Sequence, residues 1–343
     1  MCASQIIVAR SRAGVVLKVC AALLFTLALD AAQATSSGTE LVAPVPLTAA
    51  QWFEQGQTAL VGGLFDEALQ DFRKAATGGN AHALAAVGDL YHLGLGVARS
   101  DRDALIWYRK AAAAGDVDGQ ARLGLALVGT GTAAEQQAGL ALIRKALAAN
   151  SAYAQYALGS LHLQGKAVPR DAQLALTLLE TAARRGEVPA QSLLGQMYLD
   201  GNGVEKHSAM ALELLGDAAR MGDATAQSRL GAMFAEGWGV ERSEHEAAYW
   251  FERAAERGNL DGQALLALLL LDGEEVPRDP LKALDLLREA AASGNALAQF
   301  HLGLCFLQGR GVPQDSAQGQ NMLRQLAKAG LPEATTYLKE HSL

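Results

Sequence analysis

The stretch ATAQSRLGAMFAEGWGVERSEHEAAYWFERAAERGN, residues 224–259, decides the fold because most of the chain repeats it. Its opening phrase has the form Ala-x-Ala-Gln-x-x-Leu-Gly and recurs at intervals of 35 or 36 residues. Self-similarity at a fixed period is the signature of a repeat protein, in which each unit buries its apolar face against the next. The phrase or a divergent copy of it begins at residues 81, 117, 152, 188, 224, 260 and 296.

Within one unit, the spacing of apolar residues predicts two helices joined by a turn. Leu230 and Phe234 lie one turn apart on the first helix, and Ala247 and Phe251 lie one turn apart on the second. Gly231 stands beside the first pair. A glycine inside a helix costs about 1 kcal/mol relative to alanine, so we expect close packing of the two helices to retain it.

Glycines and capping residues predict where the helices begin and end. Gly237 and Gly258 can take the left-handed conformation that ends a helix. Ser243 is placed to cap the second helix, as Ser or Asp is in most other units. His207 occupies this position in one unit, and there we expect the neighbouring Ser208 to act as the cap instead.

The pattern therefore predicts an all-α repeat fold, a solenoid of about eight 36-residue helix-turn-helix units that fills residues 47–343. A half unit from residue 332 is expected to cap its C-terminal end, because Lys339 stands there where other units have a buried glycine. The unit that begins at Val117 departs most from the others. Its segment VGTGTAAEQQAGL lacks the Val and Asp of the turn, so the repeat pattern leaves that turn undefined.

The unit resembles the Sel-one-like repeat (SLR), a relative of the tetratricopeptide repeat (TPR). The resemblance rests on the pattern A-x-A-Q-x-x-L-G-x-x-Y-x-x-G-x-G-V-x-x-D-x-x-x-A-x-x-W-Y-x-x-A-A-x-x-G and covers the chain from about Leu47 to its C-terminus. It implies a right-handed α/α superhelix of antiparallel helix pairs with a concave groove. It also implies a role as a scaffold or adaptor in secretion, exopolysaccharide, motility or signalling assemblies of the cell envelope, or in contact with host proteins.

The N-terminus predicts export from the cytoplasm. Basic residues precede an 11-residue apolar run at 19–29, and an Ala-x-Ala motif ends at Ala34. This is the three-part layout of a secretory signal peptide, and the run is too short to span a bilayer. We expect cleavage after Ala34 to remove residues 1–34, residues 35–46 to form a flexible linker, and the mature protein to be periplasmic or secreted without a membrane span.

Composition and motifs favour a binding protein over an enzyme. Asp and Glu outnumber Lys and Arg by 36 to 29, which argues against a nucleic-acid partner. The seven histidines are scattered, and no metal or cofactor motif appears. A β-lactamase-like hydrolase stays a remote alternative without a Ser-x-x-Lys or Lys-Thr-Gly motif. Cys305 falls at a position where other units have apolar residues, so we expect a core thiol.

The candidate partner-binding residues lie on the first helices and in one turn. If the first helices pack as the resemblance to TPR proteins implies, Tyr153 and Tyr156 face the concave groove in a mixed region. They could also stack on sugars there, so a polysaccharide-binding module is the alternative function. Trp238 stands in the middle of a turn where other units have mostly polar residues. The last full units carry an apolar set suited to a partner helix or peptide, unless the half unit from Pro332 covers it. This set is Leu268, Leu271, Leu297, Phe300, Leu304 and Leu307.

Overall fold

A computed structural model describes residues 46–342. The expected signal peptide at 1–34 and nearly all of the expected linker at 35–46 lie outside the described residues. Residues 47–343 form one compact unit. In the described part every regular element is an α-helix, and none of these helices is both long enough and apolar enough to cross a membrane.

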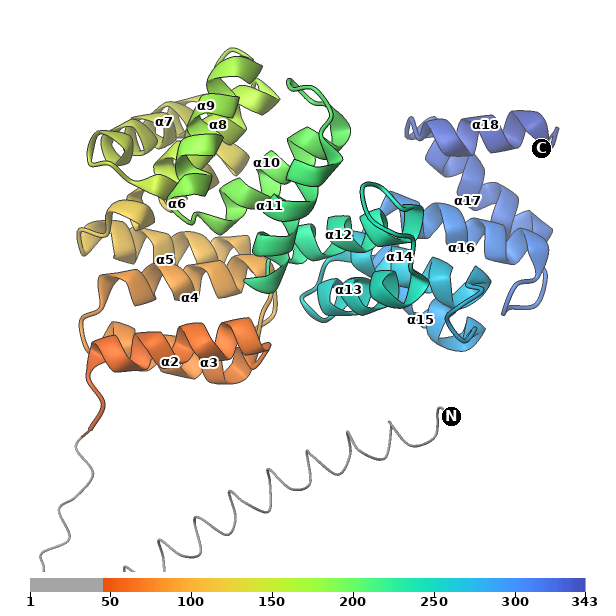
Figure 1. Ribbon diagram of the computed structural model, residues 1–343, viewed down its shortest axis with the longest axis horizontal. Helices are drawn as coiled ribbons and strands as arrows, with labels where there is room; N and C mark the ends of the chain where they lie inside the picture. Colours follow the sequence, from red (N-terminus) through yellow and green to blue (C-terminus); the bar gives the residue numbers. More distant parts are fainter. Residues whose placement is uncertain (1–45, 343) are drawn as a thin grey trace, which may run out of the picture. The chain divides into compact units, whose positions relative to one another are not determined.

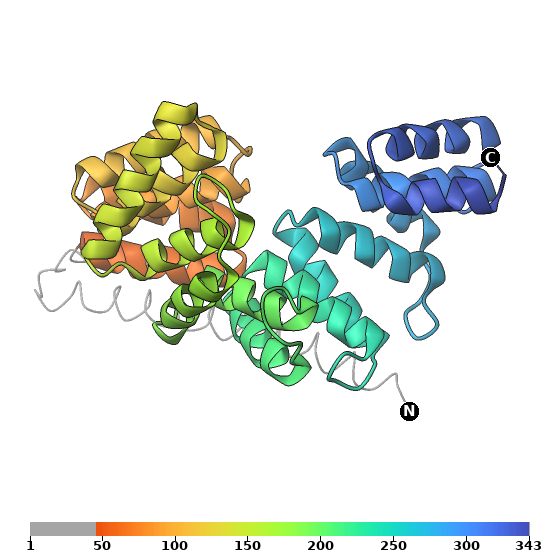
Figure 2. The ribbon, with the colours of Figure 1, turned by 90° about the horizontal axis from the view of Figure 1, so that it is seen from above.

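The helices follow one another as eight pairs and a final single helix (Figures 1 and 2). The first helices of the pairs are α2 (Ala49–Gly62), α4 (Ala81–Leu93), α6 (Val117–Thr130), α8 (Ala152–Gln164), α10 (Val188–Asp200), α12 (Ala224–Glu236), α14 (Leu260–Asp272) and α16 (Ala296–Gln308). The second helices are α3 (Phe65–Thr77), α5 (Asp101–Ala113), α7 (Ala133–Ala148), α9 (Ala172–Arg184), α11 (Ser208–Arg220), α13 (Glu244–Glu256), α15 (Pro280–Ala292) and α17 (Ser316–Lys328). The final helix is α18 (Pro332–Glu340). The predicted all-α repeat fold is confirmed.

Direct contacts between consecutive pairs run mainly through the first helices. From α4 to α16, each first helix contacts the next first helix, and each second helix packs against the first helix that follows it. Contacts between consecutive second helices are at most marginal in the described part of the chain. Because the more closely packed row of a curved stack lies on its inner side, the first helices line the concave face.

Glycine allows the close approach of the two helices in a pair. A Cβ atom on Gly231 would lie 2.6 Å from the ring of Phe251, and one on Gly195 would lie 2.7 Å from Leu215. Phe251 and Ala247 are 1% and 0% exposed, so this contact is the centre of the pair's core. The predicted reason for the glycine is confirmed, since any side chain there would have to displace a core residue.

The side chains expected to cap the second helices do so, except that Ser208 does not cap α11. His207 itself caps α11, since its Nδ1 atom accepts the backbone N–H of Met210 at 3.2 Å. A neutral imidazole has one unprotonated nitrogen that can accept such a bond. The expectation that Ser208 would replace it was wrong, because Ser208 is already the first residue of the helix. The regular caps that accept a backbone N–H are Ser100, Asp171, Ser243, Asp279 and Asp315.

In three units, the glutamine of the repeat phrase ties the unit to the one before it. The side-chain amide of Gln227 donates to the carbonyl of Ala219 at 3.0 Å, and that of Gln299 donates to the carbonyl of Ala291 at 2.9 Å. Both carbonyls lie in the last turn of the preceding second helix, where carbonyls have no partner within the helix. The two carbonyls also accept the backbone N–H groups of Gly222 and Gly294, so the glutamine adds a second hydrogen bond at the boundary between units.

One contact joins two pairs that are far apart in the sequence. Arg257, which follows α13, donates to the carbonyls of Leu60 and Val61 at the end of α2, at 3.2 and 2.8 Å. Arg257 is only 7% exposed, and its guanidinium lies 5.2 Å from the centre of the Phe65 ring. A cation at the C-terminal end of a helix meets unpaired carbonyls and the negative end of the helix dipole. Arg257 thus links the first pair to the sixth.

Candidate functional site

An ion pair joins α4 and α6 on the concave face. Arg122 on α6 donates through Nε to both carboxylate oxygens of Asp89 on α4, at 3.0 and 2.9 Å. Tyr108 on α5 donates its hydroxyl to the same carboxylate at 2.8 Å. The Arg122 side chain is only 19% exposed. A charge-assisted pair that is mostly shielded from water, with a third hydrogen bond, holds these side chains in one arrangement.

Two tyrosines on α8 continue this row of side chains. The guanidinium of Arg122 lies over the ring of Tyr153, 4.0 Å from its centre. Tyr156 meets Tyr153 edge to face, with ring centres 5.4 Å apart. The structure therefore brings together two predicted site residues. It also occupies one face of the Tyr153 ring with Arg122, which leaves less of that ring for a sugar to stack on.

The tyrosines and the arginine of this row do not change their ionisation near neutral pH. Burial raises the pKa of Tyr156 to about 12, and it raises the pKa values of Tyr153 and Tyr108 well above their ordinary value. Burial opposes the charge of Arg122, but the Asp89 carboxylate raises the pKa of Arg122 above its ordinary value. The tyrosines therefore stay neutral and Arg122 stays charged. We refer to Asp89, Tyr108, Arg122, Tyr153 and Tyr156 as the concave row.

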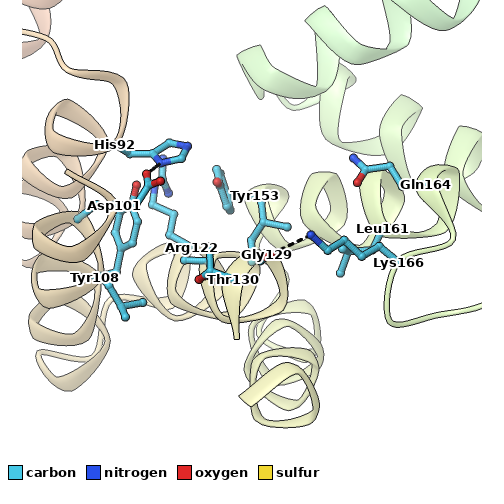
Figure 3. Close-up of a pocket in the computed structure, with 14 residues that line it drawn as sticks. His92, Asp101, Tyr108, Arg122, Gly129, Thr130, Tyr153, Leu161, Gln164 and Lys166 are labelled. Atoms are coloured by element: carbon cyan, nitrogen blue, oxygen red, sulfur yellow. Dashed lines mark hydrogen bonds and ion pairs between the residues drawn. The ribbon is translucent and has the colours of Figure 1, made fainter. Parts of the chain in front are cut away.

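A cavity of about 260 Å³ opens beside the concave row, between α5, α6 and α8 (Figure 3). Leu105, Leu125 and Leu161 contribute apolar surface to it. In Figure 3, His92 and Asp101 lie on one side of the cavity and Lys166 lies on the opposite side, with Arg122 and Tyr153 between them. The cavity therefore combines an apolar interior with a polar rim.

The polar rim is made by two short contacts. His92 Nδ1 lies 2.7 Å from Asp101 Oδ1, which joins the end of α4 to the start of α5. Lys166 Nζ donates to the carbonyl of Gly129 at 2.9 Å, which joins the turn after α8 to the end of α6. Each contact holds one wall of the cavity in place.

The cavity exists partly because one unit has lost its loop. From α4 onward, seven residues connect the two helices of every other pair, but only Gly131 and Thr132 connect α6 to α7. Thr132 starts α7 at once through a capping box with Glu135. The turn that the repeat pattern left undefined is therefore a connection of only two residues.

In the regular units, the loop covers the start of the preceding second helix. A Cβ atom on Gly203 would lie 2.6 Å from Ala172 at the start of α9, and one on Gly239 would lie 2.7 Å from Ser208 at the start of α11. The connection between α6 and α7 is too short to cover the start of α5 in this way. The start of α5, with Asp101, therefore lines the cavity instead of packing under a loop.

A small residue enlarges the same space. Ala126 lines the cavity at the tenth position of its unit. Four other units have a large apolar residue there, and it is buried: Leu90, Leu161, Met197 and Met233. The unit at 117–151 thus departs from the pattern twice, and both departures leave room at the same place.

The apolar set predicted at the C-terminal end is not one open patch. Phe300, Leu304 and Leu307 pack in a cluster with residues of α17 and α18, and the rings of Phe300 and Tyr337 have centres 6.2 Å apart. Leu271 is a core residue, 7% exposed. The last helix therefore covers much of the set. Leu268 is half-buried, and Leu297 is half-buried against the core that includes Leu271.

Trp238 lies on the surface, in the turn between α12 and α13. It is 45% exposed, and its backbone N–H donates to the carbonyl of Met233 at 3.0 Å. At the same turn position, Leu95 is buried, and Lys166 and Arg310 reach back to the preceding unit. Because its large ring is exposed at this position, Trp238 stays a predicted contact residue for a partner.

The described residues hold no group of three or more His, Cys, Asp or Glu side chains arranged for a metal ion. Cys305 lies in the core at 2% exposure, as its repeat position predicts, and burial raises the pKa of its thiol. The sequence interpretation missed Arg122 and Tyr108 as site residues. The signal that could have found their neighbourhood was the missing turn after Thr130 together with Ala126 in place of a large apolar residue.

Comparison with known proteins agrees with this architecture. The pattern of the Sel1 repeat, which is the Sel-one-like repeat expected from the sequence, matches six segments that together make up more than half of the chain. The chain belongs to the Sel1 repeat family. The segments are 81–116, 152–187, 188–223, 224–259, 260–295 and 296–331. Residues 117–151, the unit that lost its loop, are not among them.

One solved structure shows the same kind of fold, and two further ones are similar in sequence. A Sel1 repeat protein from Oxalobacter formigenes is 32% identical, with 85% of this chain and 86% of that chain covered and a TM-score of 0.51. A protective antigen of uropathogenic Escherichia coli, described as displaying an SLR fold, is 26% identical, with 85% and 71% covered and a TM-score of 0.44. A Sel1 repeat protein from Klebsiella pneumoniae is 25% identical, with 59% and 98% covered and a TM-score of 0.40. No curated protein matches the chain.

Proposed function

We propose that this Sel1 repeat protein is a non-enzymatic scaffold that binds a segment of a partner protein along its concave face. The observation that carries the proposal is the concave row, in which side chains from four helices of three successive pairs, α4, α5, α6 and α8, hold one another in place. Stacked repeats of this kind present extended concave surfaces that suit protein partners.

The concave row has the physical properties of a binding surface. Its side chains are already fixed, so a partner would lose little further side-chain entropy on binding. Tyrosine and arginine are also the residue types that carry most of the binding energy in protein interfaces. A carbohydrate-binding module, the alternative function, is less well supported because Arg122 already occupies one face of the Tyr153 ring.

We further propose that the scaffold acts in the periplasm or outside the cell, in an envelope assembly or in contact with a host. The basic, apolar and Ala-x-Ala segments that end at Ala34 support export. N-terminal sequencing of the protein purified from the envelope or the medium tests this. We expect Thr35 as the first residue, and an intact N-terminus in the cytosolic fraction would contradict export.

Site-specific photo-crosslinking tests the binding face. We expect benzoylphenylalanine in place of Tyr156, in the concave row, to crosslink one dominant partner in cells. The matched control carries the same substitution at Tyr249, a 51% exposed tyrosine on the second helix α13. Equal crosslinking from both positions, or crosslinking from Tyr249 alone, would show that the concave face is not the binding surface.

The same assay tests Trp238. We expect Trp238→Ala to lower the crosslinking yield at position 156 several-fold while leaving the helical circular dichroism unchanged, because the ring is 45% exposed and outside the core. An unchanged yield would remove Trp238 from the interface and leave the concave row as the remaining predicted surface.

A further inference from the structure

We propose that the cavity between α5, α6 and α8 receives one large apolar side chain of the partner segment, and that Lys166 pairs with a carboxylate beside that side chain. This inference rests on the proposed function and specifies the chemistry of the partner. The recognised segment is an extended peptide with an aromatic or branched aliphatic residue next to Asp or Glu.

The size and lining of the cavity suit an apolar side chain. Its volume is about 260 Å³. An apolar cavity of about 150 Å³ in another protein is large enough to bind benzene. Leu105, Leu125 and Leu161 line the interior here, so an aromatic ring or a branched chain would exchange water for apolar contacts.

The charges around the cavity favour an acidic neighbour for that side chain. Asp101 lies 2.7 Å from His92, and Arg122 is bonded to Asp89 at 2.9 Å, so these charged groups already have partners. Lys166 bonds to an uncharged carbonyl, and among the described residues it has no carboxylate within ion-pair distance. A carboxylate of the partner would complement this cation.

The position of the cavity favours a segment of a protein as the ligand. Tyr108, Arg122 and Tyr153 belong both to the concave row and to the cavity lining. A peptide that lies along the concave face therefore passes the mouth of the cavity and can place a side chain in it. This arrangement of a groove with a side pocket is how proteins select a residue in an extended peptide.

Two separate features of the sequence open the cavity. The turn between α6 and α7 is reduced to Gly131 and Thr132, and Ala126 stands where other units bury a leucine or methionine. Either change alone would leave part of the space filled. Restoring a large side chain at position 126 therefore gives a direct way to fill the cavity without replacing any residue of the concave row.

Synthetic peptides provide the test. Acetylated and amidated peptides Gly-Gly-Xaa-Glu-Gly-Gly, with Phe, Leu, Trp or Ala as Xaa, are titrated into the purified full-length mature protein by isothermal calorimetry. We expect the Phe, Leu or Trp peptide to bind at least tenfold more tightly than the Ala peptide. Replacing Glu by Gln in the best peptide is expected to weaken binding about threefold to tenfold. Maltohexaose is the probe for a carbohydrate.

Variants assign the binding to the cavity. We expect Ala126→Leu and Ala126→Met to weaken the best peptide at least tenfold while circular dichroism and the melting temperature show a folded protein. Lys166→Met should weaken the Glu peptide but not the Gln peptide. Arg310→Met is the matched control, because it removes a cation from the same turn position of a distant unit and should change neither affinity.

Several outcomes would overturn the inference. The first is that no apolar peptide binds saturably at millimolar concentration, and the second is that both Ala126 variants bind the best peptide as tightly as the native protein does. The third is that Lys166→Met weakens the Glu and Gln peptides equally. The fourth is that the protein binds maltohexaose in preference to the peptides. The crosslinking assay separates this inference from the proposed function. If the partner crosslinks to the Ala126→Leu variant as well as to the native protein, the proposed scaffold function stands but the cavity is not where the partner's side chain binds.

Discussion

The regular unit at 224–259 and the irregular unit at 117–151 perform the same packing with different means. In the regular unit, Gly231 lets the two helices close on the ring of Phe251, and a seven-residue loop covers the preceding unit. In the irregular unit, a Cβ atom on Gly124 would lie 2.6 Å from the carbonyl of Gly139, and the loop is gone. The irregular unit therefore keeps its own core but no longer covers its neighbour.

This difference shows that a loop in such a solenoid belongs functionally to the unit before it. The twenty-first positions of two units illustrate the point. The Glu244 side chain, which lies under the loop of the next unit, is 5% exposed, whereas the Asp101 side chain, which has no loop above it, is 52% exposed. A deletion in one unit can thus create a site in the previous one without weakening the repeat that carries the deletion.

The largest expected effect comes from breaking the ion pair of the concave row. Asp89→Asn leaves the buried guanidinium of Arg122 without a carboxylate, and we expect a loss of about 2 kcal/mol in the free energy of unfolding, since Asp89 is partly exposed. The matched control is Asp272→Asn, which breaks the exposed pair with Arg310 and should cost at most about 0.5 kcal/mol. Urea unfolding measures both.

A double variant sharpens this result. Asp89→Asn combined with Arg122→Met removes both charges, and we expect it to be less destabilised than the sum of the two single variants, because no unpaired charge is left buried. Equal losses for Asp89→Asn and Asp272→Asn would show that the concave row is no more fixed than an ordinary surface pair.

The next prediction compares two glycines at which the paired helices pack closely. At Gly124 an added methyl meets a backbone carbonyl at 2.6 Å, whereas at Gly303 it meets the flexible end of Leu323 at 3.2 Å. We expect Gly124→Ala to cost about 1–2 kcal/mol after the gain in helix propensity, and Gly303→Ala to range from neutral to about 1 kcal/mol more stable. Thermal melting followed by circular dichroism measures the difference. If Gly303→Ala destabilised the protein more than Gly124→Ala, α7 would be able to move away from α6 at little cost.

The fold could be predicted from the sequence because its determinants are local and repeated. A cap such as Ser243 and a buried pair such as Ala247 and Phe251 depend on residues a few positions apart, and each unit confirms the others. The cap at His207 was not predicted because an imidazole is an uncommon helix cap, although it can accept the same hydrogen bond.

The candidate site was only partly predictable, because its contacts cross between units. Tyr153 and Tyr156 were found from their groove positions. The bond between Asp89 and Arg122 joins residues 33 positions apart, and no period reveals it. The cavity depends on a loop that is missing from one unit, and its effect falls on α5 of the preceding unit. A repeat pattern describes what the units share, so it cannot report a feature made by one unit's departure from the others.

A smaller effect concerns the loop contact that the irregular unit lacks. The Glu244 carboxylate accepts the backbone N–H groups of Glu274 and Glu275 at 2.7 and 2.9 Å, which anchors the loop of the next unit on the start of α13. We expect Glu244→Gln to cost about 1 kcal/mol and to speed hydrogen exchange of these two amides. Asp101→Asn, at the same unit position without a loop, should cost less than half as much.

The hydrogen bond from Glu275 lowers the pKa of Glu244, so this anchor also depends on pH. A carboxyl group with a lowered pKa in the folded state stabilises the protein above its ordinary pKa, and that stabilisation is lost as the pH falls through the lowered value. The stability difference between the native protein and Glu244→Gln should therefore shrink on acidification below the ordinary carboxyl pKa. A difference that stays constant down to that range would contradict the anchoring role.

The smallest expected change in stability is the most informative about why the cavity is there. Ala126→Leu adds apolar atoms to open space, so we expect the free energy of unfolding to stay equal or to rise by up to about 1 kcal/mol, with calorimetric melting as the measurement. A loss of more than about 1 kcal/mol would mean overpacking, and position 126 would then have no room for the residue that other units carry. If the variant is at least as stable as the native protein, the alanine is not required by packing. The native sequence would then forgo stability to keep this space open, which is the relation expected between stability and a binding site.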